Sequence, residues 1–240
     1  MTRLTSSQRF GFTLPEILVV LAITAILIAL IIPSIHIVRN RMNTQTTISN
    51  LRTLQQANLM FANDHGGQTV PPQVNGDYSA GMWFQNEAFL SYLGIVPTDR
   101  MWDEDWPIYA KSGHPGASPN QPPGKMDRQA SIGINLGLKQ HWPNSDGSFN
   151  DLSVNINHVK NPSRAMAFAD AKDTWIRMDR ADSWQNDDPP WYTMAIAYRN
   201  GAKADGTGGK AAVVFFDGHV ELLTREQVIG NWELWIADGD

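Results

Sequence analysis

Cysteine is absent from this 240-residue chain, and cationic side chains are few. The missing cysteine excludes a disulfide scaffold, a cysteine zinc site and a cysteine nucleophile. Only 19 lysines and arginines are present beside 24 acidic residues, which leaves a net charge of −5. A nucleic-acid-binding protein needs a concentrated basic surface to neutralise phosphates, so we expect no nucleic-acid partner.

The sequence motifs of common hydrolases are missing as well. No His-Glu-x-x-His or Gly-x-Ser-x-Gly pattern occurs, EF-hand spacing is absent, and the six histidines are scattered along the chain. A serine or zinc hydrolase therefore has no support in the sequence. We expect a protein without catalytic activity and without a cofactor.

One long apolar run is present, and it lies near the N-terminus. Between Arg9 and Arg39 the one residue with a formal charge is Glu16, and 20 of the 27 residues from 12 to 38 are apolar. As a helix rising ~1.5 Å per residue, this segment is long enough to cross a hydrocarbon core of ~30 Å. No second run is comparable, so the sequence predicts one membrane span over residues 12–38, with the rest of the chain in water.

Three kinds of segment have this composition: a cleaved secretory signal, a plain anchor, and an anchor that is also used for assembly. A secretory signal ends in a small-x-small cleavage site, which is missing after Ile32. A plain anchor has no use for Glu16, because a carboxylate at the entrance of an apolar helix is costly unless it is paired. The choice therefore depends on the residues that precede the run.

A glycine and a phenylalanine precede the run, after a short polar leader with two arginines and no acid. The six residues are Gly11, Phe12, Thr13, Leu14, Pro15 and Glu16. This segment resembles the type IV prepilin family, which includes the pseudopilins of type II secretion. The resemblance implies that a membrane-embedded prepilin peptidase cuts after Gly11 and that the new amine of Phe12 is methylated. It covers only about residues 9 to 38, but six consecutive residues, the leader and the apolar helix agree.

By the same resemblance, Glu16 becomes the fifth mature residue and Pro33 the twenty-second, and both positions match the family's pattern. A buried carboxylate is tolerated beside a cation, and the N-terminal amine of an adjacent filament subunit can supply one. Glu16 and Pro33 are thus the predicted assembly residues, with Pro33 as a flexible point in the shaft. The alternatives are that Glu16 contacts water or lipid headgroups and that Pro33 simply breaks the helix at the membrane surface.

Beyond the apolar run, the sequence predicts that the helix continues to the pair Gly66-Gly67, because few helix breakers intervene. Apolar residues recur there every three to four positions and form one face that needs a sheet to pack on. They are Ile48, Leu51, Leu54 (or Gln55), Leu59 and Ala62. The predicted division is a leader at 1–11, a transmembrane assembly helix at 12–38, its soluble continuation at 39–67 and an extracytoplasmic domain at 68–240, with a long proline-rich loop at about 97–130.

Strand-like segments follow a short expected helix that runs from about Trp83 to Leu93. Their ranges are 131–135, 152–159, 165–169, 174–178, 192–198, 211–216 and 219–223. Thr224 and Gln227 have the spacing of a capping box, which predicts a final short helix. A long helix followed by a sheet gives an α+β fold, in which the N-terminal transmembrane and amphipathic helix packs on a C-terminal antiparallel sheet.

A predicted two-residue turn, Asp217-Gly218, joins the last two strands, since both residues can adopt φ > 0. The segment around it resembles the C-terminal motif of a pseudopilin-like family, a histidine followed by nine residues and Asp-Gly. The position of that histidine is Thr207 here, which puts any role of the histidine in doubt. We therefore interpret Asp217, Gly218 and His219 as a structural turn and its polar edge.

Two further ligand classes stay open for the C-terminal half. Some secretion pseudopilins bind calcium in a C-terminal loop, and by that resemblance four aspartates could converge on a cation, although spacing alone cannot show convergence. They are Asp170, Asp173, Asp187 and Asp188. Tryptophans near polar and proline residues could stack on a saccharide, or they could anchor loops on a small sheet. They are Trp184, Trp191, Trp232 and Trp235.

The resemblance implies a structural pilin-like subunit of a type II secretion pseudopilus or a type IV pilus. Its expected partners are the prepilin peptidase and methyltransferase, other pilin or pseudopilin subunits, and the bacterial inner membrane. The N-terminus would be cytoplasmic and the C-terminal domain periplasmic. The alternative is a membrane-tethered binding module for a saccharide or for secreted cargo.

Overall fold

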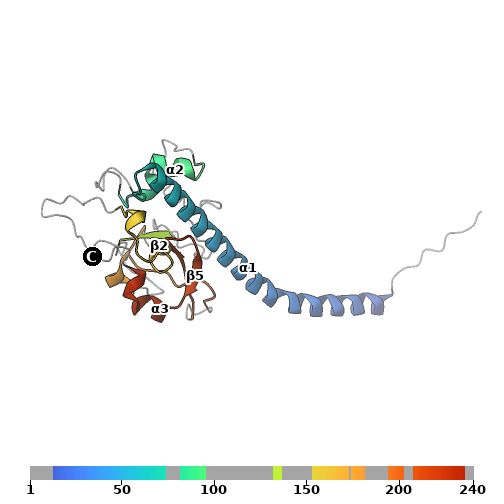
Figure 1. Cartoon of the computed structure of the whole chain (residues 1–240). Helices are drawn as coiled ribbons and strands as arrows, with labels where there is room; N and C mark the ends of the chain where they lie inside the picture. Colours follow the sequence, from blue (N-terminus) through green and yellow to red (C-terminus); the bar gives the residue numbers. More distant parts are fainter. Residues whose placement is uncertain are drawn as a thin grey trace, which may run out of the picture. The chain divides into compact units, whose positions relative to one another are not determined.

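The computed structural model describes residues 13–73, 82–95, 132–136, 153–172, 174–181, 194–202 and 208–235. Side chains of residues 30–37 lie outside this description, as do the predicted leader and the predicted loop at about 97–130. Two compact units divide the chain, Met1–Asn40 and Arg41–Asp240. Figure 1 colours the elements along the sequence.

The longest element is the helix α1, Leu14–Asp64, which contains 51 residues and continues through Pro33. It ends at the predicted glycine pair, where Gly66 and Gly67 adopt φ of 63° and 89°. The Gly67 N–H donates to the Ala62 carbonyl at 2.8 Å and so caps the last turn. The sequence thus predicts the end of α1 correctly.

The sequence also predicts a membrane span over residues 12–38. Within the described part of the chain, no helix combines the length and the apolar character needed to cross a membrane. The structure therefore does not confirm this span.

The sheet of the second unit has five strands in the order β3-β1-β2-β4-β5. Their bounds are Ile132–Asn135 (β1), Met166–Asp170 (β2), Trp175–Ile176 (β3), Ala211–Phe215 (β4) and Val220–Leu223 (β5). The α+β class is confirmed, but the prediction of a purely antiparallel sheet is wrong, because β1 and β3 are parallel. Both edges of β2 are occupied, one by β1 and the other by β4. After β2 the chain reverses, and β3 pairs with the outer edge of β1, to which it runs parallel.

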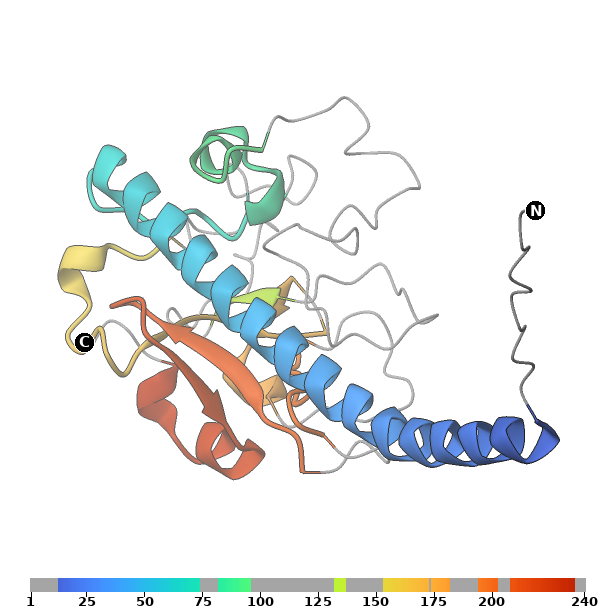
Figure 2. The ribbon, with the colours of Figure 1, turned by 90° about the vertical axis from the view of Figure 1, so that its right-hand side faces the viewer.

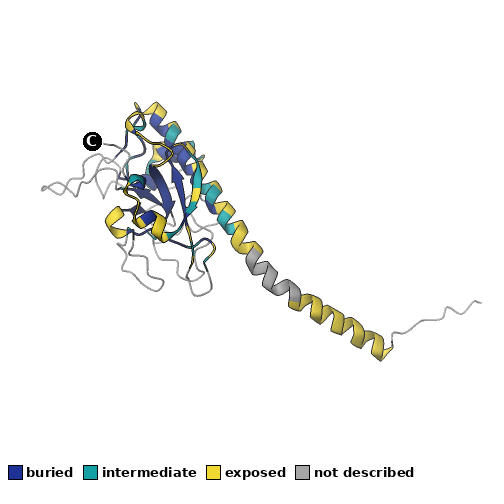
Figure 3. Ribbon diagram, turned by 60° about the horizontal axis from the view of Figure 1, so that its bottom comes forward, coloured by how far each residue is buried: buried dark blue, intermediate teal, exposed yellow. Residues whose placement is uncertain are grey.

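Both faces of the sheet are covered, and Figure 2 shows α1 crossing one of them. Along β4, Ala212 and Val214 join the core cluster that contains Leu51 and Leu54 of α1. Val213 belongs to the cluster on the other face. That second cluster also contains side chains of the short elements α3 (Arg225–Ile229) and η7 (Trp232–Leu234). β4 is therefore buried along its whole length, and Figure 3 shows the dark blue of buried residues at the centre of the sheet.

A β-bulge in β2 lets two consecutive residues face α1. Ala167 and Phe168 both belong to the cluster on the α1 face, whereas Met166 and Ala169 belong to the opposite cluster. The register with β4 shifts between Met166 and Phe168. The extra residue breaks the two-residue alternation and places the Phe168 ring beneath Trp83, with ring centroids 5.4 Å apart.

The buried face of α1 includes two polar residues. Leu51, Leu54 and Ala62 are buried as expected, Gln55, the predicted alternative to Leu54, is buried beside it, and Asn58 is a buried residue that the pattern did not predict. Gln55 Nε2 donates to the Phe216 carbonyl at 2.9 Å, and Asn58 Oδ1 accepts from the Val70 N–H at 3.0 Å. These amides satisfy backbone groups of loops that the helix covers.

Two predicted strands and one predicted helix differ from the structure. Residues 156–158 form the 3-10 helix η5, Ile156–His158, because the Asn155 side chain accepts from the Asn157 N–H and turns the chain. In the described residues 194–198, Ile196 makes an isolated bridge but no strand. The helix expected at 83–93 is divided at Asn86 into η3 (Trp83–Gln85) and α2 (Glu87–Tyr92), because Asn86 caps α2. η6, Met178–Arg180, follows β3.

Candidate functional site

The start of α1 holds the predicted assembly carboxylate in a local hydrogen-bond pair. The Thr13 backbone N–H donates to Glu16 Oε2 at 2.7 Å, and the Thr13 hydroxyl donates to the same oxygen at 2.8 Å. This is one half of a capping box, in which a helix-start carboxylate satisfies a backbone N–H. Within the described residues both bonds end on Oε2, so Oε1 remains open to a further donor.

The first turns of α1 expose apolar side chains on every side. The exposed ones are Leu14, Ile17, Leu18, Val19, Val20, Leu21, Ile23, Ile26, Leu27 and Ile28, each between 47% and 76% exposed. Because residues 17–21 are consecutive, at 3.6 residues per turn they cover the whole circumference of the helix. The polar Thr24 donates its hydroxyl back to the carbonyls of Val20 and Leu21. A helix that is apolar all round needs lipid or other helices around it.

The other predicted processing and assembly residues are only partly visible. Gly11 and Phe12 lie outside the described residues, and Pro33 lies within α1 with its side chain outside the description. The structure therefore describes the geometry around Glu16 but not that of the predicted cleavage site.

The residues of the predicted C-terminal turn form a compact hairpin loop. The Phe215 N–H donates to the His219 carbonyl, and the Gly218 N–H donates to the Phe215 carbonyl. Gly218 has φ of 90°, while Asp217 is not among the positive-φ residues, so the loop has three residues, 216–218, with a bulge at the glycine. The predicted two-residue turn is wrong. Asp217 Oδ1 accepts from the His219 backbone and contacts its Nδ1 at 2.5 Å, which fits a structural role.

Asp170, one of the four candidate calcium ligands, is buried at the end of β2. Its Oδ2 accepts from Asn200 Nδ2 at 2.6 Å. Burial lowers the pKa of the neighbouring Arg199 guanidinium, and the Asp170 carboxylate opposes that effect. Asp173, Asp187 and Asp188 lie outside the described residues. Among the residues described, no cluster of three or more potential ligands could hold a metal ion.

The candidate tryptophans do not form one surface where they are described. Trp235 is fully buried, and its indole N–H donates to the Val228 carbonyl. Trp232 is 62% exposed. Trp184 and Trp191 lie outside the described residues. Trp235 therefore anchors the C-terminal segment on the sheet, as one of the two interpretations expected.

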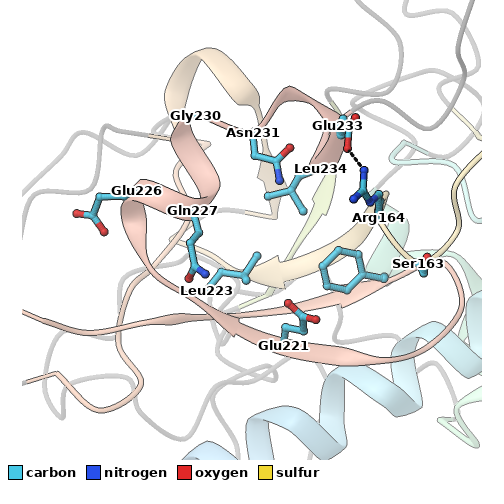
Figure 4. Close-up of a pocket in the computed structure, with 11 residues that line it drawn as sticks. Ser163, Arg164, Glu221, Leu223, Glu226, Gln227, Gly230, Asn231, Glu233 and Leu234 are labelled. Atoms are coloured by element: carbon cyan, nitrogen blue, oxygen red, sulfur yellow. Dashed lines mark hydrogen bonds and ion pairs between the residues drawn. The ribbon is translucent and has the colours of Figure 1, made fainter.

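An open pocket of about 560 Å³ lies where α3 and η7 meet the edge of the sheet. Its apolar part consists of Phe215 of β4, Leu223 of β5 and Leu234 of η7. Figure 4 shows Glu221 and the Arg164–Glu233 pair beside these residues, whereas the Glu226 side chain points away from them on the outer side of α3. Neither composition nor periodicity predicted this pocket, because its walls come from segments up to 71 positions apart, Ser163 to Leu234.

The charged side chains of the pocket carry a net charge of −2, from three glutamates and one arginine. Arg164 is paired with Glu233 at 2.6 Å, drawn as a dashed line in Figure 4. Glu221 Oε1 lies 3.5 Å from His219 Nε2. Glu226 stands at the start of α3, and its charge, together with burial as the larger cause, raises the pKa of the nearby Tyr198 hydroxyl. The pocket is therefore an acidic recess with an apolar floor.

Comparison with protein-family models supports the resemblance seen at the N-terminus. Residues 6–32 match the model described as the prokaryotic N-terminal methylation motif. This match is consistent with a prepilin- or pseudopilin-type protein and covers only the first part of the chain. Comparisons with curated proteins and with solved structures found no match.

Proposed function

We propose that the chain is a structural subunit of a type II secretion pseudopilus or a type IV pilus. The methylation motif at residues 6–32 indicates a pilin-like substrate of the prepilin peptidase. The observation that carries the proposal further is the helix that follows the motif, whose apolar side chains are exposed on all sides. Packing of this segment against the same segment in other copies would bury them.

In this proposal the peptidase cuts after Gly11, and the methylated amine of Phe12 lies beside Glu16 of a neighbouring copy. The described contacts of Glu16 support such a pairing, since both hydrogen bonds from Thr13 end on Oε2 and, among the residues that the structure describes, leave Oε1 available. The free-energy cost of removing a paired amine and carboxylate from water is partly offset by their mutual attraction, whereas a lone carboxylate has no such compensation. Pro33 would serve as a flexible point in the assembled shaft.

Before assembly, the apolar segment would hold the subunit in the bacterial inner membrane, with its N-terminus in the cytoplasm and its domain in the periplasm. The chain would catalyse no reaction, and its contribution would be mechanical. We propose no cofactor for it.

Mass spectrometry of the mature N-terminus tests the processing step. N-methylated Phe12 is the expected result, and a mature protein that still begins with Met1 would refute the proposal. Assembly is tested by crosslinking: two copies carrying Ile17→Cys should crosslink to each other, because no native cysteine competes.

The role of the Glu16 charge is tested by a matched pair of variants. Glu16→Gln keeps an acceptor for Thr13 but removes the charge, whereas Glu16→Leu removes both. If the charge pairs with a neighbour's amine, both variants insert into the membrane and both fail to enter a filament. Normal incorporation of Glu16→Gln would show that the hydrogen bonds to Thr13 suffice.

The acidic pocket favours one alternative, a membrane-tethered module that binds cargo. Such a module would carry the same processing motif, but its N-terminal helices would not pack together. A processed chain that gives no crosslink through Ile17→Cys would support this alternative over the filament subunit.

A further inference from the structure

The pocket between β5, α3 and η7 has room for one more positive charge. Arg164 is already paired with Glu233 at 2.6 Å, whereas among the described residues the ion-pair partner of Glu221 is the His219 ring, at 3.5 Å. Hydrogen bonds at the start of α3 lower the pKa of Glu226, so this carboxylate is ionised near neutral pH. A cation that enters the pocket would therefore meet the Glu221 carboxylate, with the Glu226 charge nearby on α3.

The shape and lining of the pocket favour an arginine side chain over a bare ion. The apolar floor of Phe215, Leu223 and Leu234 can cover an aliphatic stem while the carboxylates hold the charged head. Trp232 lies between two pocket-lining residues and is 62% exposed. Guanidinium groups form forked hydrogen bonds with carboxylates, and the exposed Trp232 ring offers an apolar surface to a side chain next to the bound arginine.

The complementary charge lies on α1 of the same chain. Between Glu16 and Asp64 this helix has no acidic residue, and the arginines Arg41 and Arg52 are exposed on it. Eleven residues make close to three helical turns, so these two arginines share a face. In the part of the chain that is described, neither forms an ion pair. Next to Arg41, the apolar side chain of Met42 is 64% exposed.

We propose that the pocket binds Arg41 of a second copy of this chain, with Met42 of that copy packed on Trp232. The inference rests on the proposed function, because a filament brings copies into repeated contact. The two surfaces differ, so the pocket of one copy can contact Arg41 of the next, and such a head-to-tail contact produces an open helical array when its rotation does not close a ring. Copies cut after Gly11 lose Arg3 and Arg9, so their formal side-chain charge changes from −5 to −7 and they repel one another. A local pair of opposite charges offsets that repulsion.

The absence of native cysteine allows a direct test in the full-length chain. Two differently tagged copies are co-expressed, one with Arg41→Cys and the other with Glu221→Cys. A short bis-maleimide is used, because the Cα atoms of an Arg–Glu pair lie farther apart than the roughly 7 Å that a disulfide permits. A crosslink that joins the two tags is the expected result.

Two control pairs define the contact. Arg52→Cys with Glu221→Cys places the thiol about 16 Å along α1 from position 41, and Arg41→Cys with Glu87→Cys moves the acidic partner to the exposed start of α2. Both control pairs should crosslink at background level. A crosslink of equal yield in either control would overturn the assigned contact.

The homotypic Ile17→Cys crosslink separates the two proposals. If it forms and the 41–221 crosslink does not, the filament proposal stands and the pocket assignment is wrong. If neither forms, both are wrong. A crosslink from position 221 to a different protein, instead of to the second copy, would also overturn the assignment.

Charge reversal gives an independent measurement. Arg41→Glu and Glu221→Arg should each lower the yield of assembled copies about fivefold or more, because each places like charges opposite one another. The double variant should recover most of the loss. Assembly of both single variants at the wild-type level, or no recovery in the double variant, would refute the pairing.

Discussion

Truncation of Asn58 tests how the segment at Val70 is held on the C-terminal half of α1, within the second unit. The side chain is 2% exposed, and it serves two buried partners: its Oδ1 accepts from the Val70 N–H at 3.0 Å, and its Nδ2 donates to Gln55 Oε1 at 3.2 Å. Asn58→Ala leaves both groups without these bonds. Each buried polar group left unsatisfied costs about 1–3 kcal/mol, and the longer bond to Gln55 contributes the smaller share. We expect the free energy of unfolding to fall by about 2–4 kcal/mol.

The assay is urea-induced unfolding of the full chain in detergent, followed by tryptophan fluorescence, with the loss of stability taken from the midpoint at an unchanged slope. Asn63→Ala is the matched control, since Asn63 is exposed on the same helix and bonds only its neighbour Asp64. Its effect should stay within about 0.5 kcal/mol. If Asn58→Ala costs no more than Asn63→Ala, the amide does not hold the segment at Val70, and the argument from buried hydrogen bonds is wrong.

Two further changes follow from other contacts. A Cβ atom at Gly209 would collide with the Tyr198 carbonyl oxygen, so Gly209→Ala should lower the free energy of unfolding by about 1–3 kcal/mol or more. Gly230→Ala is the control, because its Cβ atom would lie 3.6 Å from its nearest neighbour atom. In the same urea experiment, the control should leave the free energy of unfolding nearly unchanged. The Tyr92 hydroxyl donates to Asp64 Oδ2 at 2.6 Å and is the main cause that lowers the pKa of Asp64 below its ordinary 3.8. This carboxylate thus stabilises the folded chain above pH 3.8 and loses that contribution as the pH falls through the lowered pKa. In an NMR titration, Tyr92→Phe should raise the pKa of Asp64 toward 3.8. An unchanged pKa of Asp64 would contradict the assignment of Tyr92 as the main cause.

Features decided by neighbouring residues could be predicted from the sequence. The glycine pair that ends α1 and the capping box of Thr224 and Gln227 depend on residues a few positions apart, and both occur as expected. The hairpin between β4 and β5 was also predicted, but its loop length was not. A two-residue loop would need φ > 0 at Asp217, and the three-residue loop avoids that strain by using Gly218 alone.

Features decided by distant segments could not be predicted. The parallel pairing of β3 depends on which sheet edges remain open once β2 lies between β1 and β4. The hydrogen bonds of the buried Gln55 and Asn58 could not be predicted, because the backbone groups that they satisfy belong to loops elsewhere in the chain. The pocket has the same origin, since strand, helix and loop residues form it only after the chain has folded.

The two properties of α1 should be separable because they belong to different stretches of one helix. Side chains from 14 to 28 are exposed wherever they are described, while burial against the sheet begins at Thr47 and continues to Ala62. Glu16 and Asn58 are 42 residues apart and belong to different compact units, and changes at distant sites without shared partners act independently. A loss of assembly in Glu16→Leu without a loss of stability, together with the reverse in Asn58→Ala, would assign assembly to the first stretch and domain stability to the second.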